Sequence, residues 1–346
     1  MTAPERPEFD VVIPTVGRPS LAPLVRHLGR TVSSASRIVV ADDRPDTRTP
    51  LLDGIDCLDD DPRITVVQSG GHGPAAARNR GWRATSRSWV AFLDDDVELP
   101  LGWVRDLADD LQAAPPTVGA VTGRIEVPHS PRRRPSDWER NVACLERAQA
   151  VTADMAIRRA ALEAVGGFDE RFPRAYREDT DLVLRLEDAG WRVVRGQREV
   201  WHRARPAPWW ISVRLQRGNA DDVLLERRHG PGWRQRVGEP TGSYPQHRLT
   251  VAVAAAALGA ALAGRPTAAR IVAAAWLVRT ARFAWSRIAP GPRTPREVAA
   301  MLVTSAAIPP AACGHRLAGR LRWRAIEAPA VPSRLGRHGR TAASRR

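Results

Sequence analysis

The sequence predicts an α/β fold with a parallel sheet, followed by an all-α region rich in Ala and Arg. Short β-branched runs alternate with helix-like patterns over the first hundred residues, at the spacing of a parallel α/β sheet. Acidic residues directly follow two of these runs, and ligands of such sheets bind beyond the carboxyl ends of the strands. The last hundred residues contain three uncharged, Ala-rich stretches instead.

The predicted strands of the first half are short apolar runs that end at a proline, a glycine or a carboxylate. They cover residues 10–14, 37–41, 64–67 and 89–93. Residues 20–28 have a helical pattern, and residues 74–87 fit a second helix with a proline in its first turn. The fourth strand runs straight into three consecutive Asp residues.

The second half of the predicted sheet domain begins after a Pro- and Arg-rich stretch at 128–140, PHSPRRRPSDWER, which we expect to be an exposed loop. Residues 153–165 and 179–188 then show helical patterns that end at glycines. Residues 191–194 and 199–202 are candidate strands.

Three uncharged runs mark the Ala-rich region. They cover residues 249–263, 271–278 and 298–313. None reaches the roughly 18 to 20 residues that a bilayer span requires. We therefore expect helices that form a hairpin, lie in a membrane interface or pack on one another. On a helical wheel Arg279, Arg282 and Arg287 share one side of the second run.

The chain is thus expected to have three parts. Residues 1–246 form the sheet domain, and residues 247–322 form the helical, membrane-associating region. Residues 323–346 are basic and have almost no apolar side chains to bury, so we expect them to be disordered.

The net charge of +15 is confined to the end of the chain. From Arg248 onward, 17 Arg accompany only two Glu, whereas the first 247 residues hold equal numbers of basic and acidic residues. A basic region suits either nucleic acid or the anionic inner leaflet of a membrane. Few aromatic side chains interleave with these arginines, so we expect the membrane and no nucleic acid.

Cysteine usage and the first residues bear on the compartment. Cys57, Cys144 and Cys313 are too few and too scattered for a disulfide framework or a metal-binding pair. The N-terminal residues lack the basic end and apolar run of a secretory signal. We expect a cytoplasmic protein that associates with the inner face of the cell membrane.

The triplet Asp94, Asp95 and Asp96 is a candidate metal site, because three adjacent carboxylates repel one another unless a cation neutralises them. Mg²⁺ and Mn²⁺ take oxygen ligands and keep positions for a substrate's phosphates. In an extended segment Asp94 and Asp96 point the same way, so one can reach a ribose or a bridging water while the other binds the ion. The alternative is a solvated acidic turn that caps the following helix.

Other residues at the strand ends suit a nucleotide. Asp42 and Asp43 can accept hydrogen bonds from a base or a ribose, although an Asx turn explains them equally well. In the turn from Pro14 to Arg18, Gly17 lets the backbone approach a ligand. Residues 73–80, GPAAARNR, place small residues at a helix start with Arg78 as a planar fork of donors, although tight helix–sheet packing needs the same alanines.

A second acidic cluster, Glu178, Asp179 and Asp181, opens the helix predicted at 179–188. An ionised carboxylate at a pocket edge can take a proton from an attacking hydroxyl. The alternative is that these residues merely cap the helix, which is the role we expect for Asp181. His202, at a strand end, can supply a nitrogen ligand to the same metal, although a lone His is more often structural.

Several of these stretches, in this order, resemble the family 2 glycosyltransferases, which have the GT-A fold. The resemblance runs from about Phe9 to about Pro206. It rests on VVIPTVGR, IVVADD, AARNRGW, VAFLDDDVELP, ADMAIRRAALEAVGGFDERFPRAYREDTDLVLRL and WHRARP. The longest of these is the most specific, because GGFDE, a spacer and EDTDL-RL rarely occur together by chance.

The resemblance implies a Rossmann-like sheet that binds a UDP-, GDP- or dTDP-linked sugar, and a hydroxyl acceptor. It implies metal-dependent transfer with inversion, in which Asp179, paired with Glu178, takes the acceptor's proton. Asp96, in the DXD motif, would bind Mn²⁺ or Mg²⁺ directly, and His202 would complete the metal site. The implied nucleotide-sugar-binding residues are Pro14, Thr15, Gly17, Arg18, Asp42, Asp43, Arg78, Asp94 and Asp95.

Two positions depart from the family pattern. Asp154 stands on the acceptor side where the family more often has Asn, so acceptor identity is affected. Arg44 replaces the Gly usual after the acidic pair, which bears on base or donor preference. Together with the basic C-terminal region, the resemblance suggests a lipid-linked or cell-envelope acceptor.

Two other function classes compete with this prediction. A nucleotidyltransferase would use a similar sheet and similar carboxylates, but PTVGRPSL is a poor version of its Gly-rich signature and EDTDL has no place in it. A non-catalytic membrane-bound scaffold would have lost catalytic residues, whereas Asp96, Asp179 and His202 are all present.

Overall fold

The computed structural model describes residues 7–33, 36–49, 51 and 61–326. An eight-stranded sheet runs in the order β3-β2-β1-β4-β7-β6-β8-β5. The strands are β1 (Phe9–Thr15), β2 (Ile38–Asp42), β3 (Ile64–Gln68), β4 (Trp89–Leu93), β5 (Val97–Glu98), β6 (Val118–Glu126), β7 (Asp154–Arg158) and β8 (Arg192–His202).

The parallel half of the sheet is the half that the sequence predicted. Strands β1 to β4 are mutually parallel, and all four strands predicted before residue 94 form within one or two residues of their expected positions. The second half of the sheet adds antiparallel pairing, because β7 runs antiparallel to both β4 and β6. The sheet is therefore mixed.

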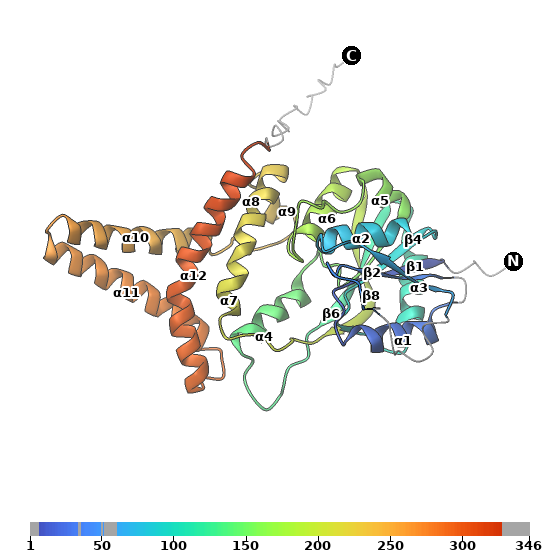
Figure 1. The fold of residues 1–346 in the computed structure, drawn as a ribbon, viewed down its shortest axis with the longest axis horizontal. Coiled ribbons are helices and arrows are strands. Elements are labelled where there is room, and N and C mark those ends of the chain that lie inside the picture. The colour runs from blue at the N-terminus through green and yellow to red at the C-terminus, as the bar shows by residue number, and fades with distance from the viewer. Residues whose placement is uncertain (1–6, 34–35, 50, 52–60, 327–346) are drawn as a thin grey trace, which may run out of the picture.

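Two helical layers cover the sheet (Figure 1). Helices α1 (Leu21–Thr31) and α3 (Trp103–Ala113) pack on one face, and their buried side chains join one core cluster with β1. Helices α2 (Pro74–Arg83), α5 (Arg159–Val165) and α6 (Glu178–Asp188) contribute to the core on the other face. The two cores hold the strand ends in fixed positions.

The helix predicted over 153–165 is wrong in its first half, where β7 forms, and only Arg159–Val165 is helical. Met155, Ala156 and Ile157 are fully buried between β4 and β6. A strand buried on both faces lacks the alternation that distinguishes it from a helix. The two strands predicted at 191–194 and 199–202 are one strand, β8.

The Pro- and Arg-rich stretch is exposed over residues 129–134. Its end, however, is helix α4 (Asp137–Val142), which starts with a capping box between Ser136 and Glu139. Asp137 pairs with Arg287 of the C-terminal region, with Oδ2 and Nη2 2.7 Å apart. The stretch thus ties the sheet domain to the last helices.

The region after the sheet is helical, as predicted. Its short elements are α7 (Ile211–Arg214), α8 (Gly218–His229) and α9 (Trp233–Arg236), and its long helices are α10 (Tyr244–Leu262), α11 (Pro266–Ile288) and α12 (Pro295–Arg322). Figure 1 shows α10 and α11 as a hairpin that projects from the body, with α12 across its base.

Helix α12 corrects the expectation that no segment is long enough to span a bilayer. It has 28 residues, and its most apolar 18-residue window has a mean hydropathy of 1.3. The uncharged run covers only residues 298–313, whereas the helix extends beyond it on both sides. Of that window, 39% is buried inside the protein, so length and composition alone are weak evidence of a span.

The last described residues also correct an expectation. Trp323 and Ile326 pack on a core cluster that includes Phe172, Leu224 and Trp233, so the expected disordered tail does not begin at 323. The rest of that tail, from residue 327, and Cys57 lie outside the described residues. Cys144 and Cys313 are free thiols.

Close packing of α12 on α8 predicts a difference between two glycines of α12. A Cβ at Gly319 would lie 2.7 Å from the backbone Cα of Ala220, whereas one at Gly314 would meet nothing within 4 Å. We expect Gly319→Ala to lower the free energy of unfolding by about 1–3 kcal/mol through overpacking. We expect Gly314→Ala, the control, to raise it by about 0.5–1 kcal/mol through helix propensity. Urea unfolding measures both, and equal effects would contradict the packing.

Candidate active site

The candidate residues gather at the carboxyl edge of the parallel strands. Thr15 ends β1, Asp42 ends β2, and Asp94 follows β4. The β1–β2 register places Thr15 beside Asp42. Because β1 lies between β2 and β4, these strand ends form one continuous edge.

Asp94, Asp96 and His202 form a candidate metal cluster. One ligand atom from each lies within 4.8 Å of the others, and His202 Nε2 is 3.4 Å from Asp96 Oδ1. The short strand β5 brings them together, because Val97, next to Asp96, pairs directly with His202 across the β5–β8 ladder. The predicted meeting of the acidic triplet and His202 therefore occurs in the structure.

The protonation of this cluster depends on its ion pairs. Burial raises the pKa of Asp96, but the hydrogen bond and charge of His202 and the charge of Arg205 outweigh it, so the pKa lies below its usual value. Burial lowers the pKa of His202, but Asp96 outweighs it and the pKa is raised.

The cluster fits a divalent cation. Asp96 Oδ2 and His202 Nδ1 are buried and have no hydrogen-bond partner in the described part of the chain, although Arg205 Nε lies 2.8 Å from Asp96 Oδ2. Two carboxylates and an imidazole are ligands that Mn²⁺ and Mg²⁺ accept. A cation would thus compete with Arg205 for Asp96, whereas the free nitrogen of His202 needs no existing contact to break.

Asp95 points away from this cluster, toward the end of β1. It accepts hydrogen bonds from Thr15 Oγ1 and from Arg18 Nη1, both at 2.5 Å. Burial raises the pKa of Asp95, although both partners oppose the shift. The three residues hold the β1 turn against the acidic triplet, so all three lie on the side where the nucleotide was expected.

Arg78 joins the two acidic motifs of the sequence. Its side chain is only 2% exposed on α2, with Nη2 2.8 Å from Asp94 Oδ1 and Nη1 2.8 Å from Glu178 Oε1. Its guanidinium lies 5.6 Å from the centre of the Phe168 ring. The sequence predicted that the Arg78 guanidinium donates hydrogen bonds to a nucleotide. In the structure both of its terminal nitrogens instead form ion pairs with carboxylates of the protein.

Three carboxyl groups, those of Asp94, Glu178 and Asp179, surround this single guanidinium. Burial raises the pKa of Glu178 to about 8, with the Asp179 charge adding to the shift and Arg78 opposing it. Burial also raises the pKa of Asp179, again against Arg78. A retained proton or a bound divalent cation would each relieve the repulsion between these carboxyl groups.

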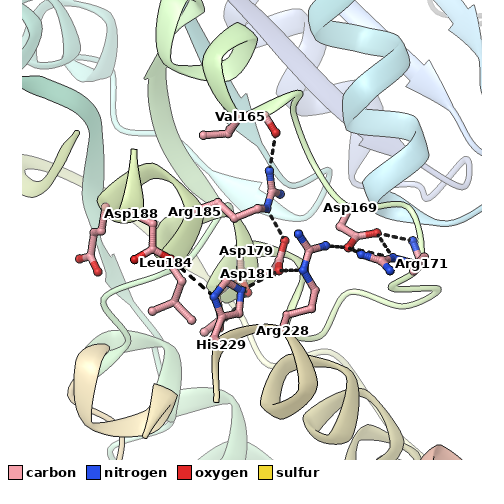
Figure 2. A network of polar contacts seen from close by, with 12 residues as sticks. Val165, Asp169, Arg171, Asp179, Asp181, Leu184, Arg185, Asp188, Arg228 and His229 are labelled. Carbon is pink, nitrogen blue, oxygen red and sulfur yellow. Dashed lines mark hydrogen bonds and ion pairs between the residues drawn. The ribbon is translucent and has the colours of Figure 1, made fainter. Parts of the chain in front are cut away.

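The three acidic residues of the first turn of α6 have different surroundings. Asp181 is fully buried, 2.7 Å from Arg185 Nε and 2.9 Å from His229 Nε2, in the network of Figure 2. Glu178 is paired with Arg78. Asp179 is half-buried and forms no ion pair with any described residue, while its Oδ1 accepts a hydrogen bond from the Thr180 backbone N–H at 2.7 Å. Of the three, Asp179 is the carboxylate best placed to accept a proton.

The network in Figure 2 fixes the position of α6. Arg228, from α8, lies 3.3 Å from Asp181 and also pairs with Asp169. Arg185 additionally donates to the Val165 carbonyl at the end of α5. Asp181 therefore has a structural role, as expected, but through buried ion pairs rather than as a helix cap.

Asp42 and Asp43 lie at the predicted edge, and both are engaged. Arg44 forms a two-pronged ion pair with Asp42, and its side chain lies over Gly17, 3.1 Å from where a Cβ would stand. Asp43 accepts hydrogen bonds from Ser69 Oγ and from the Gly73 backbone N–H, which orders the loop before α2. Pro14 is buried one residue before the end of β1.

Asp154 does not reach the candidate site. Its side chain is fully buried on β7, where Arg198 Nε lies 2.9 Å from Oδ1 and the Trp103 indole N–H donates to Oδ2. The expectation that Asp154 faces the acceptor is therefore wrong for this conformation. Its charge is neutralised by Arg198 inside the sheet, a partner that the family pattern did not reveal.

Two residues near the site were missed. Arg205 pairs with Asp96, and Arg177 has a left-handed backbone with φ of 79° immediately before Glu178. The Arg177 guanidinium contacts Asp222 at 2.8 Å and lies 4.6 Å from the centre of the Trp233 ring. These contacts, between parts of the chain distant in sequence, hold a strained backbone conformation that directs the first turn of α6.

Removing Arg78 should destabilise the protein strongly. Arg78→Met leaves Asp94 and Glu178 without their buried counter-charge, and we expect a loss of about 3–5 kcal/mol in the free energy of unfolding. Arg80→Met, on the exposed side of the same helix, is the matched control and should change it by less than about 0.5 kcal/mol. Guanidinium unfolding distinguishes the two, and a small effect of Arg78→Met would contradict the bridge.

The raised pKa of Glu178 predicts a pH dependence. The folded state holds a proton on Glu178 up to about pH 8, whereas the unfolded chain releases it near 4.5. The folded state therefore binds more protons in this window, and stability should fall as pH rises from 4.5 to 8. Glu178→Gln should flatten that fall when unfolding is measured at several pH values in EDTA. An unchanged pH profile would contradict the shift.

Comparison with known proteins finds a family match within the sheet domain. Residues 10–164 match the family model described as glycosyl transferase family 2. The pre-mycofactocin glycosyltransferase of Mycobacterium tuberculosis is 34% identical over 134 residues, in two strains. That match covers 35% of this chain and 28% of the relative, so the chain spans little more than a quarter of the curated proteins it matches.

Solved structures show weaker likeness. Glucosyl-3-phosphoglycerate synthase from M. tuberculosis, in complex with Mn²⁺, UDP and phosphoglyceric acid, matches at a TM-score of 0.46 and 16% identity, covering 68% of this chain and 81% of that one. S. aureus TarS matches at a TM-score of 0.44 and 15% identity, covering 66% and 42%. With TM-scores below 0.5, neither supports a statement about the ligands of this chain.

The family match covers β1 through α5, and thus the acidic triplet and the strand ends that surround it. Glu178, Asp179 and His202 follow it in the chain and are joined to it by the contacts of Arg78 and Asp96. The mixed α/β sheet with a C-terminal helical region agrees with the GT-A fold expected for such a domain. The similarity to glycosyl transferase family 2, an enzyme family, therefore lies in residues 10–164 of the sheet domain.

Proposed function

We propose that the protein transfers a sugar from a nucleotide-diphosphate donor to a hydroxyl acceptor, with a divalent cation at Asp94, Asp96 and His202. The observation that carries this proposal is the metal cluster lying at the strand edge, joined through Arg78 to the Glu178–Asp179 pair. One site would thus hold both a cation that stabilises the leaving diphosphate and a carboxylate that accepts the acceptor's proton. The cation, Mn²⁺ or Mg²⁺, would neutralise the charge of the leaving diphosphate.

The chain's own residues have distinct tasks in this proposal. Asp179 accepts the proton of the acceptor hydroxyl as its oxygen forms a bond with the anomeric carbon and the bond from that carbon to the diphosphate breaks. A single displacement of this kind inverts the anomeric centre. Arg78 holds Glu178 and Asp94 at fixed separation, and Arg177 orients the turn that carries Asp179.

The nucleotide is proposed to lie along the ends of β1 and β2. Thr15, Arg18 and Asp95 form one wall, and Gly17 and Asp43 stand at the same edge. Arg44 covers Asp42, so recognition of a base by that carboxylate requires Arg44 to move or to take part. The proposed donors are UDP-, GDP- or dTDP-sugars, so the base is uracil, guanine or thymine.

We further propose that the acceptor is lipid-linked or belongs to the cell envelope and that the protein works at the inner face of the membrane. The concentration of positive charge after Arg248 and the apolar helices α10 to α12 support this placement.

The direct test is sugar transfer or donor hydrolysis with a panel of UDP-, GDP- and dTDP-sugars, with Mn²⁺, with Mg²⁺ and with EDTA. We expect turnover with one donor class, loss in EDTA, and a fall of about 10²-fold or more in both Asp96→Ala and Asp179→Asn.

Asp46→Asn is the matched control, because Asp46 is exposed, lies outside the site and, among the described residues, pairs with neighbouring Arg48. It should keep full turnover. Turnover that survives EDTA and both site variants would contradict the proposed chemistry. Release of diphosphate from a nucleoside triphosphate and a sugar phosphate would instead establish a nucleotidyltransferase.

A further inference from the structure

We propose that the α10–α11 hairpin is a membrane-binding element, whose apolar side chains enter the acyl region of an anionic bilayer while its arginines stay at the level of the lipid phosphates. This inference rests on the membrane association put forward above and names the segment that produces it. It does not depend on the sugar chemistry, because no residue of the hairpin takes part in the candidate active site.

The hairpin stands apart from the rest of the molecule. Helices α10 and α11 lie against each other and project from the body, while α12 crosses only their base (Figure 1). The buried residues of α10 are His247 and Thr250, both in its first two turns, and those of α11 lie in its last two turns. The far half of the hairpin is thus covered by nothing in the described chain except its partner helix.

Large apolar side chains are exposed along this far half. Leu258 is 62% exposed, Leu262 81% and Ile271 66%. Val278 and Trp285 are 58% and 60% exposed and follow Ile271 at seven-residue intervals. They therefore continue the same line along α11 from the far half toward the base. Proteins that function in water rarely expose contiguous apolar surface of this extent without a partner.

The composition of α10 indicates what kind of partner this is. From Leu249 to Leu262 the helix has no charged residue on any side. A helix that is apolar all round lies either in a protein core or in lipid, whereas a helix at a protein–protein contact usually keeps a polar face toward water. Since no core surrounds α10, lipid is the partner that covers it on every exposed side.

Charge favours an anionic surface over a second copy of the chain. No Asp or Glu occurs between Arg248 and Arg296, while Arg265 and Arg270 lie near the hairpin turn and Arg279 and Arg282 nearer its base. A second hairpin would bring the same cations and no carboxylate to neutralise them. Lipid phosphates would neutralise them, and the long Arg side chains can reach the phosphates while their helices lie at the acyl boundary.

Helix α12 is the other candidate, but its contacts assign it to the body. Gly319 packs so closely on Ala220 of α8 that no side chain fits between them, and Arg316 pairs with Glu226. Its buried residues, among them Met301, Ile308 and Ala312, face the protein along most of its length. Entry of α12 into a bilayer would break this packing, whereas entry of the far half of the hairpin leaves the contacts at its base in place.

The test is flotation of the full chain with vesicles of phosphatidylglycerol and phosphatidylcholine, compared with phosphatidylcholine alone. We expect binding to the anionic vesicles that weakens as salt rises, because Arg contacts are screened. Leu262→Asp should weaken partitioning at least about tenfold, since a charge replaces a largely exposed apolar side chain that lipid would bury.

Leu101→Asp is the matched control, because Leu101 is 86% exposed in the sheet domain and should not matter for vesicle binding. Mn²⁺ binding by the same samples, measured separately, distinguishes a failed hairpin from a failed active site. Wild-type protein that stays with no vesicle, or Leu262→Asp that binds as well as wild type, would overturn the proposal. So would a wild-type dimer that Leu262→Asp dissociates without any vesicle binding, which would assign the hairpin to a second copy.

Discussion

The site depends on one buried cation. Arg78 is fixed between Asp94, which follows β4, and Glu178, which opens α6, so a single guanidinium sets the separation of the candidate metal cluster from the proposed proton acceptor. Charges buried in this way are tolerated only when they are paired, so neither motif can shift without exposing an unpaired charge. The carboxyl groups around Arg78 outnumber it, so their pKa values are raised, and a proton or the proposed divalent cation would relieve the repulsion between them.

The rest of the fold holds this arrangement in place. The β5–β8 ladder positions His202 beside Asp96, and the α8 network around Asp181 anchors the helix that carries Asp179. The same α8 supports α12, which in turn lies at the base of the α10–α11 hairpin. A continuous set of packed helices therefore connects the proposed membrane-binding element to the proposed catalytic carboxylate.

Much of this could be predicted from local sequence, and the remainder could not for identifiable reasons. The strands before Asp94 are apolar runs with clear ends, so their positions follow from the pattern. Strand β7 was missed because it is buried on both faces and directly precedes a helix. The Arg78–Glu178 bridge joins residues 100 apart, and the partner of Asp154, Arg198, comes from a different strand; no local pattern reports either contact. The metal cluster itself was predicted because its residues resemble a known motif.

The most direct test of this account is binding of Mn²⁺ itself, because the cation is what the carboxylate excess requires. Titration of the intact chain with Mn²⁺, followed by the electron paramagnetic resonance of the free ion, should show one bound ion per chain. Asp96→Ala and His202→Ala should each weaken that binding by about 10-fold or more. Absence of binding by the intact chain, or unchanged binding by both variants, would contradict the assignment of this cluster as the metal centre.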